Sequence, residues 1–172
     1  MSGLKPTGVD DKRYRDPRAL VDARIEDLLG RMTLAEKIAQ LQTAWTNKGD
    51  FFDDDFGFDA GKAADCFPHG IGQIARPSDH CGPISPRLKP GRDATETVRL
   101  VNAAQRWAVE ETRLGIPILF HEESLHGYQS QDATSFPQAI GLASTWDPGL
   151  VEEVHALIAS EIRARGVHVA LS

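Results

Sequence analysis

Short apolar runs alternate with amphipathic stripes along the chain, and this alternation constrains the fold more than any other feature of the sequence. Runs typical of buried strands occur at 70–75, 116–120 and 167–171, with helix-like segments between them. The order strand, helix, strand, helix, strand is that of a parallel sheet, in either a doubly wound fold or a (β/α)8 barrel. We therefore expect an α/β fold.

The two helices between these strands have clear start and stop signals. The first begins at position 93 or 95 and ends near Gly115, a residue type favoured just after a helix. The second has Asp147 as its N-cap and Pro148 at its first position, and it ends at Gly166. Its predicted buried face consists of Leu150, Val154, Leu157, Ile158 and Ile162.

Two more helices are predicted before the first strand. One carries an apolar stripe from Val21 to Met32, and the other carries a stripe from Leu34 to Trp45. Thr33 has the spacing of a capping box with the glutamate three residues later. Residues 46–66 have no helical stripe and are predicted to be a long loop or an insertion.

A complete (β/α)8 barrel needs about 250 residues, whereas this chain has 172, and no helix follows its last predicted strand. Residues 1–16 are polar and lack apolar periodicity, so we expect an N-terminal arm there. We expect residues 17–172 to be the first part of an incomplete barrel domain that belongs to a longer protein.

Composition excludes several classes of partner. The net charge of −6 argues against nucleic-acid binding, which requires a basic face. No run of 18 apolar residues occurs, and the first residues lack the apolar core of a signal peptide. Cys66 and Cys81 are too few for a disulfide framework, so we expect unpaired thiols. We expect a cytoplasmic chain without a membrane or nucleic-acid partner.

Common metal and cofactor motifs do not fit. His121 and His126 are five residues apart, so they would not share the helical face that a zinc motif needs. The acidic loop starting at Asp53 lacks the Gly and Glu positions of a calcium-binding EF-hand. The glycines at 70–72 lack the third glycine of a dinucleotide-binding turn. We expect no metal and no cofactor.

The segment His121-Glu-Glu-Ser-Leu-His126-Gly127 carries the densest chemistry in the chain. It directly follows the predicted strand 116–120, and the sites of parallel α/β folds lie at the carboxyl ends of their strands. The alternative is that these side chains cap the next helix and form local ion pairs. Position and density together favour a functional role.

Residues 113–148, RLGIPILFHEESLHGYQSQDATSFPQAIGLASTWDP, closely resemble the N-terminal barrel domain of family 3 glycoside hydrolases, the β-glucosidases and β-xylosidases. The resemblance extends upstream to RIEDLLGRMTLAEKIAQL (25–42) and GIGQIARP (70–77), and downstream through EIRARGV (161–167). It implies the first part of a TIM-like (β/α)8 barrel.

The resemblance also implies a retaining mechanism with two carboxylates, acting on a β-linked oligosaccharide or an aryl glycoside with a terminal β-D-xylosyl or β-D-glucosyl residue. In the family, the nucleophile is an aspartate on a late barrel strand and the acid/base usually comes from a following domain. Neither has a counterpart in this chain. We therefore expect this chain to hold part of the sugar pocket, to contain no catalytic residue, and to be inactive without the remainder of the polypeptide.

One pocket residue is carried over by register. Many family members have an acidic residue three positions before the His-Gly pair that binds sugar hydroxyls, which corresponds to Glu123. Glu122 and His121 are further substrate-binding candidates, whereas His126 is expected to hold the loop. Glu161 is expected to be a structural carboxylate with a partner from another part of the fold.

Two alternatives remain open. The chain could be a non-catalytic carbohydrate-binding or structural α/β module. Within the enzymes of the family, the N-acetylglucosaminidase branch usually has a DxEGG-like segment where this chain has HEESLHG, and it is set aside. Glu123 stands where family glucosidases often have aspartate, and its extra methylene favours the smaller pentose over glucose. We therefore expect a bias toward xylosides.

Overall fold

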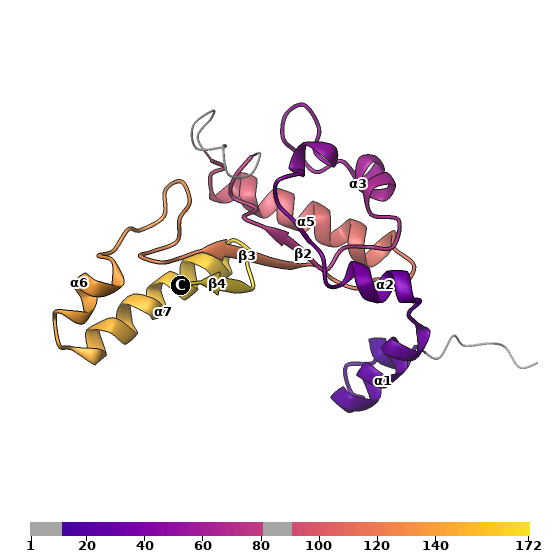
Figure 1. Ribbon diagram of the computed structural model, residues 1–172, viewed down its shortest axis with the longest axis horizontal. Helices are drawn as coiled ribbons and strands as arrows, with labels where there is room; N and C mark the ends of the chain where they lie inside the picture. The colour runs from indigo at the N-terminus through magenta and orange to yellow at the C-terminus, as the bar shows by residue number, and fades with distance from the viewer. Residues whose placement is uncertain (1–11, 81–90) are drawn as a thin grey trace, which may run out of the picture. The chain divides into compact units, whose positions relative to one another are not determined.

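The computed structural model describes residues 12–80 and 91–172 (Figure 1). The chain divides into two compact units, Met1–Lys37 and Ile38–Ser172. Cys81 and most of the predicted N-terminal arm lie outside the described residues. Among the residues that are described, no helix is both long and apolar enough to cross a membrane.

The first unit contains the short helix η1 (Arg13–Arg15) and helix α1 (Val21–Arg31). Asp27 connects them, because its carboxylate accepts hydrogen bonds from the backbone N–H of Tyr14 and from Arg31 Nε, both at 3.0 Å. The stripe predicted from Val21 is present on α1, but none of the residues of this helix is buried.

Helix α2 (Leu34–Ala39) crosses the boundary between the two units and is shorter than predicted. The capping box is confirmed, since Thr33 and Glu36 exchange side-chain-to-backbone hydrogen bonds. The prediction that this helix continues to Trp45 is wrong. Residues Thr43–Ala44 instead form strand β1, which pairs with the next strand of the sheet.

The second unit is built on a parallel four-stranded sheet in the order β1-β2-β3-β4. The other strands are β2 (Gln73–Ala75), β3 (Leu119–Glu123) and β4 (Val169–Leu171). Figure 1 labels β2, β3 and β4 of this sheet. Helix α5 (Ala94–Glu110) connects β2 to β3, and α7 (Pro148–Ala164) connects β3 to β4. The predicted α/β alternation and the three predicted strands are therefore confirmed, together with the cap Asp147. Of the two predicted starts of α5, the structure selects the first, with Asp93 as the N-cap.

Strand β3 begins three residues later than the predicted strand 116–120. Pro117 has no N–H to donate, and the backbone of Ile118 pairs with the side chain of Gln105 on α5, at 2.9 Å and 2.7 Å. The ladder therefore starts at Leu119, whose N–H donates to Gly72 O at 2.9 Å. As a result, the residues 121–123 lie within the strand and not in the loop after it, which corrects the prediction.

Two predicted loops contain short helices. The segment 46–66 holds η2 (Lys48–Asp50) and α3 (Ala60–Cys66), which is capped by the side chain of Asp59. The segment after β3 holds α6 (Ala139–Ala143). These helices have at most two turns. A segment this short contains too few residues for helical periodicity to be recognised in the sequence.

The two faces of the sheet differ. Even-numbered residues of the central strands, such as Ile74 and Phe120, are fully buried in one core with side chains of α5 and α7. On the other face, Leu119, Val169 and Leu171 are each 40–47 % exposed. In a closed (β/α)8 barrel this open face points inward and is filled by side chains from the other strands. The fold is the N-terminal portion of such a barrel.

Helix α7 follows its predicted boundaries, but its predicted face is only partly covered. Val154, Ile158 and Ile162 are buried, whereas Leu150 and Leu157 are 39 % and 58 % exposed. The buried face of α7 therefore contains fewer apolar residues than the sequence pattern predicted.

A close backbone contact between Gly72 and Gln40 gives the first testable prediction. A Cβ atom on Gly72 would lie 2.0 Å from Gln40 O, so Gly72→Ala forces the β2 backbone to move and should lower the free energy of unfolding of the full-length protein by about 1–3 kcal/mol. Urea unfolding measures this. Gly49→Ala is the control, since a Cβ there meets no atom within 4 Å. Equal stability of the two variants would contradict the contact.

Candidate functional site

Charged residues from two successive strand-to-helix connections and from strand β3 meet near the carboxyl ends of β2 and β3. Lys48 comes from the segment after β1, Arg76 and Asp79 follow β2, and Glu122 lies in β3. Lys48 and Glu122 are fully buried, and Asp79 is nearly so. Because buried charges are costly unless they are paired, this cluster must be closely organised.

Glu122 connects two of these segments. Its Oε1 accepts hydrogen bonds from the backbone N–H of Ser78 at 2.8 Å and from the hydroxyl of Tyr128 at 3.2 Å. Arg76 Nε lies 3.9 Å from the other carboxylate oxygen. Burial raises the pKa of Glu122, and the hydrogen bond from Ser78 partly opposes this shift. Glu122 therefore joins the loop after β2 to the loop after β3.

Lys48 connects the segment after β1 to the loop after β2. Its Nζ donates to the carbonyl of Arg76 at 2.5 Å and forms an ion pair with the carboxylate of Asp79. Burial lowers the pKa of Lys48 to about 8, against the opposing effect of Asp79. Asp79 also accepts a hydrogen bond from the indole of Trp45 at 3.4 Å.

His121 and Glu123 lie on the open face of β3, opposite Glu122. Both are half-buried, and His121 Nδ1 lies 3.2 Å from Gln73 Oε1 on the neighbouring strand. Burial lowers the pKa of His121, and the charge of Glu123 acts in the opposite direction. The structure therefore brings two of the three predicted site residues together and places the third on the other side of the strand.

His126 and Glu161 both form hydrogen bonds with residues of the loop after β3, and His126 also lines the cavity beside that loop. His126 contacts Gln129 through a 3.1 Å side-chain hydrogen bond, as expected of a residue that holds the loop. Glu161, half-buried on α7, accepts hydrogen bonds from the backbone N–H and the hydroxyl of Thr134, the latter at 2.6 Å. The predicted partner of Glu161 from another part of the fold is thus Thr134.

A cavity of about 360 Å³ lies between the loop after β2 and the loop after β3. Its lining includes Arg76, Ser78, Tyr128, Ser130 and Ser135. None of the three predicted site residues is part of this lining. Arg76 was not among the residues predicted from the sequence, although its place directly after a predicted strand was a signal that could have marked it.

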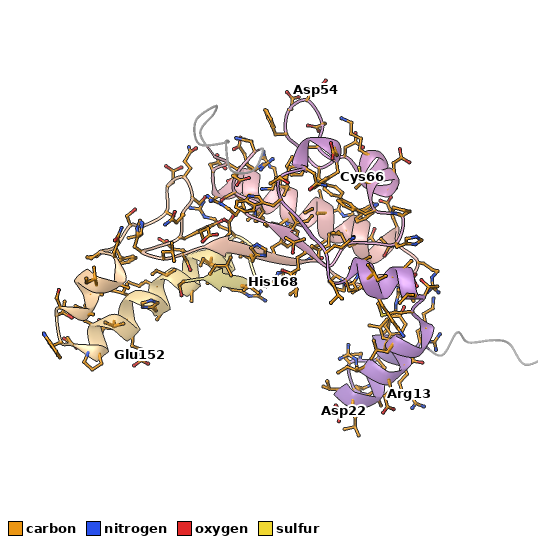
Figure 2. All side chains as sticks on the ribbon, viewed as in Figure 1. Arg13, Asp22, Asp54, Cys66, Glu152 and His168 are labelled. Atoms are coloured by element: carbon orange, nitrogen blue, oxygen red, sulfur yellow. The ribbon has the colours of Figure 1, made fainter. Side chains whose placement is uncertain are left out.

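The acidic side chains of the loop at 53–59 and Cys66 are not members of this cluster. Figure 2 shows Asp54 at the outer tip of its loop and Cys66 on α3. The neighbouring Asp53 uses its carboxylate to accept the backbone N–H groups of Asp55 and Gly57. Within the described ranges, no group of three or more His, Cys, Asp or Glu side chains is arranged to hold a metal ion.

Comparison with known proteins identifies the family. The model of the glycosyl hydrolase family 3 N-terminal domain matches residues 33–172. The chain belongs to this family.

Proteins that are similar in sequence to this chain are named as β-glucosidases and β-xylosidases. Beta-glucosidase C of Emericella nidulans is 32 % identical over 92 % of this chain, and a putative beta-xylosidase of Formosa agariphila is 27 % identical over 95 %. The solved structure of a β-glucosidase from Erythrobacter marinus matches 95 % of the chain with a TM-score of 0.71 and 34 % identity. The chain spans 20–25 % of the length of these three proteins.

The buried ammonium group of Lys48 gives a prediction about pH. Its folded pKa of about 8 lies below the unfolded value of 10.5, so the unfolded state binds more protons between these values. The free energy of unfolding of the wild-type full-length protein, relative to Lys48→Met, should therefore rise from pH 8 to pH 10.5. Urea unfolding at several pH values measures this difference. A flat difference, equal to that of the exposed control Lys37→Met, would contradict it.

Proposed function

We propose that this chain contributes part of the sugar pocket of a retaining β-glycosidase, which removes terminal non-reducing β-D-xylosyl or β-D-glucosyl residues from oligosaccharides and aryl glycosides. The observation that carries the proposal is the position of Glu123, half-buried at the carboxyl end of β3 on the face that points into a barrel. Membership of the family and the names of the relatives support it.

The geometry suggests how the three candidate residues divide the work. The carboxylate of Glu123 accepts hydrogen bonds from sugar hydroxyls, which a charged acceptor binds more strongly than a neutral one. His121, held by Gln73, lies on the same face two residues away and adds a contact to the sugar. Glu122 is fully buried on the opposite face, so its contribution is to position the loops.

The catalytic carboxylates belong, in this proposal, to the remainder of the polypeptide. A retaining glycosidase needs one carboxylate as nucleophile and a second as acid and base, about 5–5.5 Å apart. The relatives are four to five times as long as this chain, which supports such a division. The isolated chain is accordingly expected to be inactive.

The direct test compares the full-length protein with residues 1–172 on 4-nitrophenyl β-xyloside and β-glucoside. The full-length protein should release 4-nitrophenol, and NMR should detect the β-anomer of the sugar first, as retention requires. The isolated chain should match a heat-killed control. Sugar binding without hydrolysis by the full-length protein would favour the non-catalytic module instead, and early release of the α-anomer would exclude a retaining mechanism.

The side-chain length of Glu123 gives a prediction about the preferred sugar. Glutamate reaches about 1.5 Å further than aspartate, and a pentose, which lacks the C6 hydroxymethyl group, leaves room for that reach. Glu123→Asp in the full-length enzyme should therefore lower the ratio of kcat/KM for xyloside over glucoside, by up to about tenfold.

Glu152→Asp is the matched control, because it makes the same chemical change at an exposed position on α7 and should leave the ratio unchanged. Since a ratio does not depend on the fraction of folded enzyme, loss of protein does not obscure the result. If Glu123→Asp leaves the ratio unchanged, Glu123 does not set the pentose preference.

A further inference from the structure

Arg76 combines three features that the proposed role of Glu123 does not use. Its side chain is 19 % exposed and forms part of the wall of the 360 Å³ cavity. Its Nε–H is buried and, among the residues that the structure describes, has no hydrogen-bond acceptor. Its backbone has a φ of 49°, in the left-handed region that non-glycine residues rarely adopt.

The strained backbone of Arg76 is held from both sides. Its N–H donates to His121 O at 2.7 Å, and its carbonyl accepts the Nζ of the buried Lys48 at 2.5 Å. Backbone strain of this kind persists only where the surroundings enforce it, and it is concentrated at functional sites. The fold therefore fixes the position from which the guanidinium reaches the cavity.

The charges around Arg76 favour a neutral ligand. Its Nε lies 3.4 Å from a carboxylate oxygen of Asp79 and 3.9 Å from one of Glu122, both within ion-pair distance. Neither oxygen accepts a hydrogen bond from the Nε–H. Asp79, which is also paired with Lys48, lies on the cavity wall, and its carboxylate would repel an anionic ligand placed beside Arg76. The guanidinium still has donors to offer, and sugar hydroxyls are neutral acceptors for them.

The rest of the cavity also fits a saccharide. One loop contributes the amides of Gln129 and Gln131 and the hydroxyls of Ser130 and Ser135, groups that both donate and accept hydrogen bonds. The volume is at the small end of the range of about 300–1,000 Å³ typical of ligand pockets, as expected for a single sugar unit.

The cavity lies apart from the face that carries Glu123. Ser78 and Tyr128 form part of its wall, and both donate hydrogen bonds to Glu122, whose side chain leaves β3 on the opposite side from Glu123. A sugar in the cavity would therefore be a different unit of the substrate from the terminal sugar bound by Glu123.

We propose that this cavity is a second saccharide subsite, in which Arg76 donates hydrogen bonds to a further neutral sugar unit of an oligosaccharide substrate. This subsite rests on the proposed glycosidase function and adds a preference for oligosaccharides over aryl glycosides.

The test compares an unlabelled β-linked trisaccharide with the 4-nitrophenyl β-glycoside of the same sugar in the full-length enzyme. Arg76→Lys keeps the positive charge beside Asp79 and Glu122 but loses the planar fork of donors. The ratio of kcat/KM for trisaccharide over aryl glycoside should fall about tenfold, which corresponds to about 1.4 kcal/mol at 25 °C.

A second variant leaves the buried charges intact. Ser135 is exposed on the cavity wall, so Ser135→Phe should fill the cavity without disturbing Arg76 and should lower the same ratio. Arg163→Ala, which removes an exposed arginine on α7, is the control and should leave the ratio unchanged. An unchanged ratio in Ser135→Phe, or an equal fall in the control, overturns the subsite.

Calorimetric titration separates failure of the subsite from failure of the glycosidase proposal. If the wild-type protein hydrolyses neither substrate, the trisaccharide is titrated into wild-type and Ser135→Phe protein. Binding that the substitution weakens supports the cavity as a sugar site without catalysis. Absence of binding to the wild-type protein, or binding that the substitution leaves unchanged, overturns it.

Discussion

The candidate site depends on the hydrogen bonds that the buried carboxylate of Glu122 accepts. The side chain is fully buried, and a buried carboxylate is tolerated only where donors compensate for lost water. The backbone N–H of Ser78 and the hydroxyl of Tyr128 provide this compensation from two different loops. Removing the carboxylate would leave both donors, and the nearby Arg76, without their shared partner. The positions of the two loops and of the cavity between them therefore follow from this one side chain.

Lys48 extends the same principle to the segment after β1. Its ammonium group satisfies the carbonyl of Arg76 and the carboxylate of Asp79, so three consecutive strand-to-helix connections share one buried network. Arg92 adds hydrogen bonds to the carbonyls of Pro77 and Asp79 from the start of α5. Networks of this kind are specific when satisfied and costly when incomplete. Among the described residues, Arg76 Nε and Glu122 Oε2 are the two buried atoms of this network that lack a hydrogen-bond partner.

The architecture was readable from the sequence, whereas the orientation of the site was not. Apolar periodicity and the capping residues Asp93 and Asp147 predicted the main helices, because these signals depend on neighbours in the chain. The start of β3 was misplaced, since the pairing of Ile118 with Gln105 joins residues 13 positions apart, and no local pattern indicates it. The predicted strand 116–120 placed residues 121–123 in the loop after it. The prediction therefore could not show that His121 and Glu123 lie on one face of β3 and Glu122 on the other.

The alternation of side chains along β3 explains why neighbouring glutamates have different roles. Residues that are consecutive in a strand point to opposite faces, so Glu123 is directed toward the interior of the barrel and Glu122 toward the layer of helices and loops outside it. A shift of register by one residue would exchange the two carboxylates. It would bury Glu123 away from any sugar and would deprive Ser78 and Tyr128 of their acceptor. Loop anchoring by Glu122 and the proposed sugar binding by Glu123 therefore require the same register, and the buried hydrogen bonds of the first carboxylate fix the position of the second.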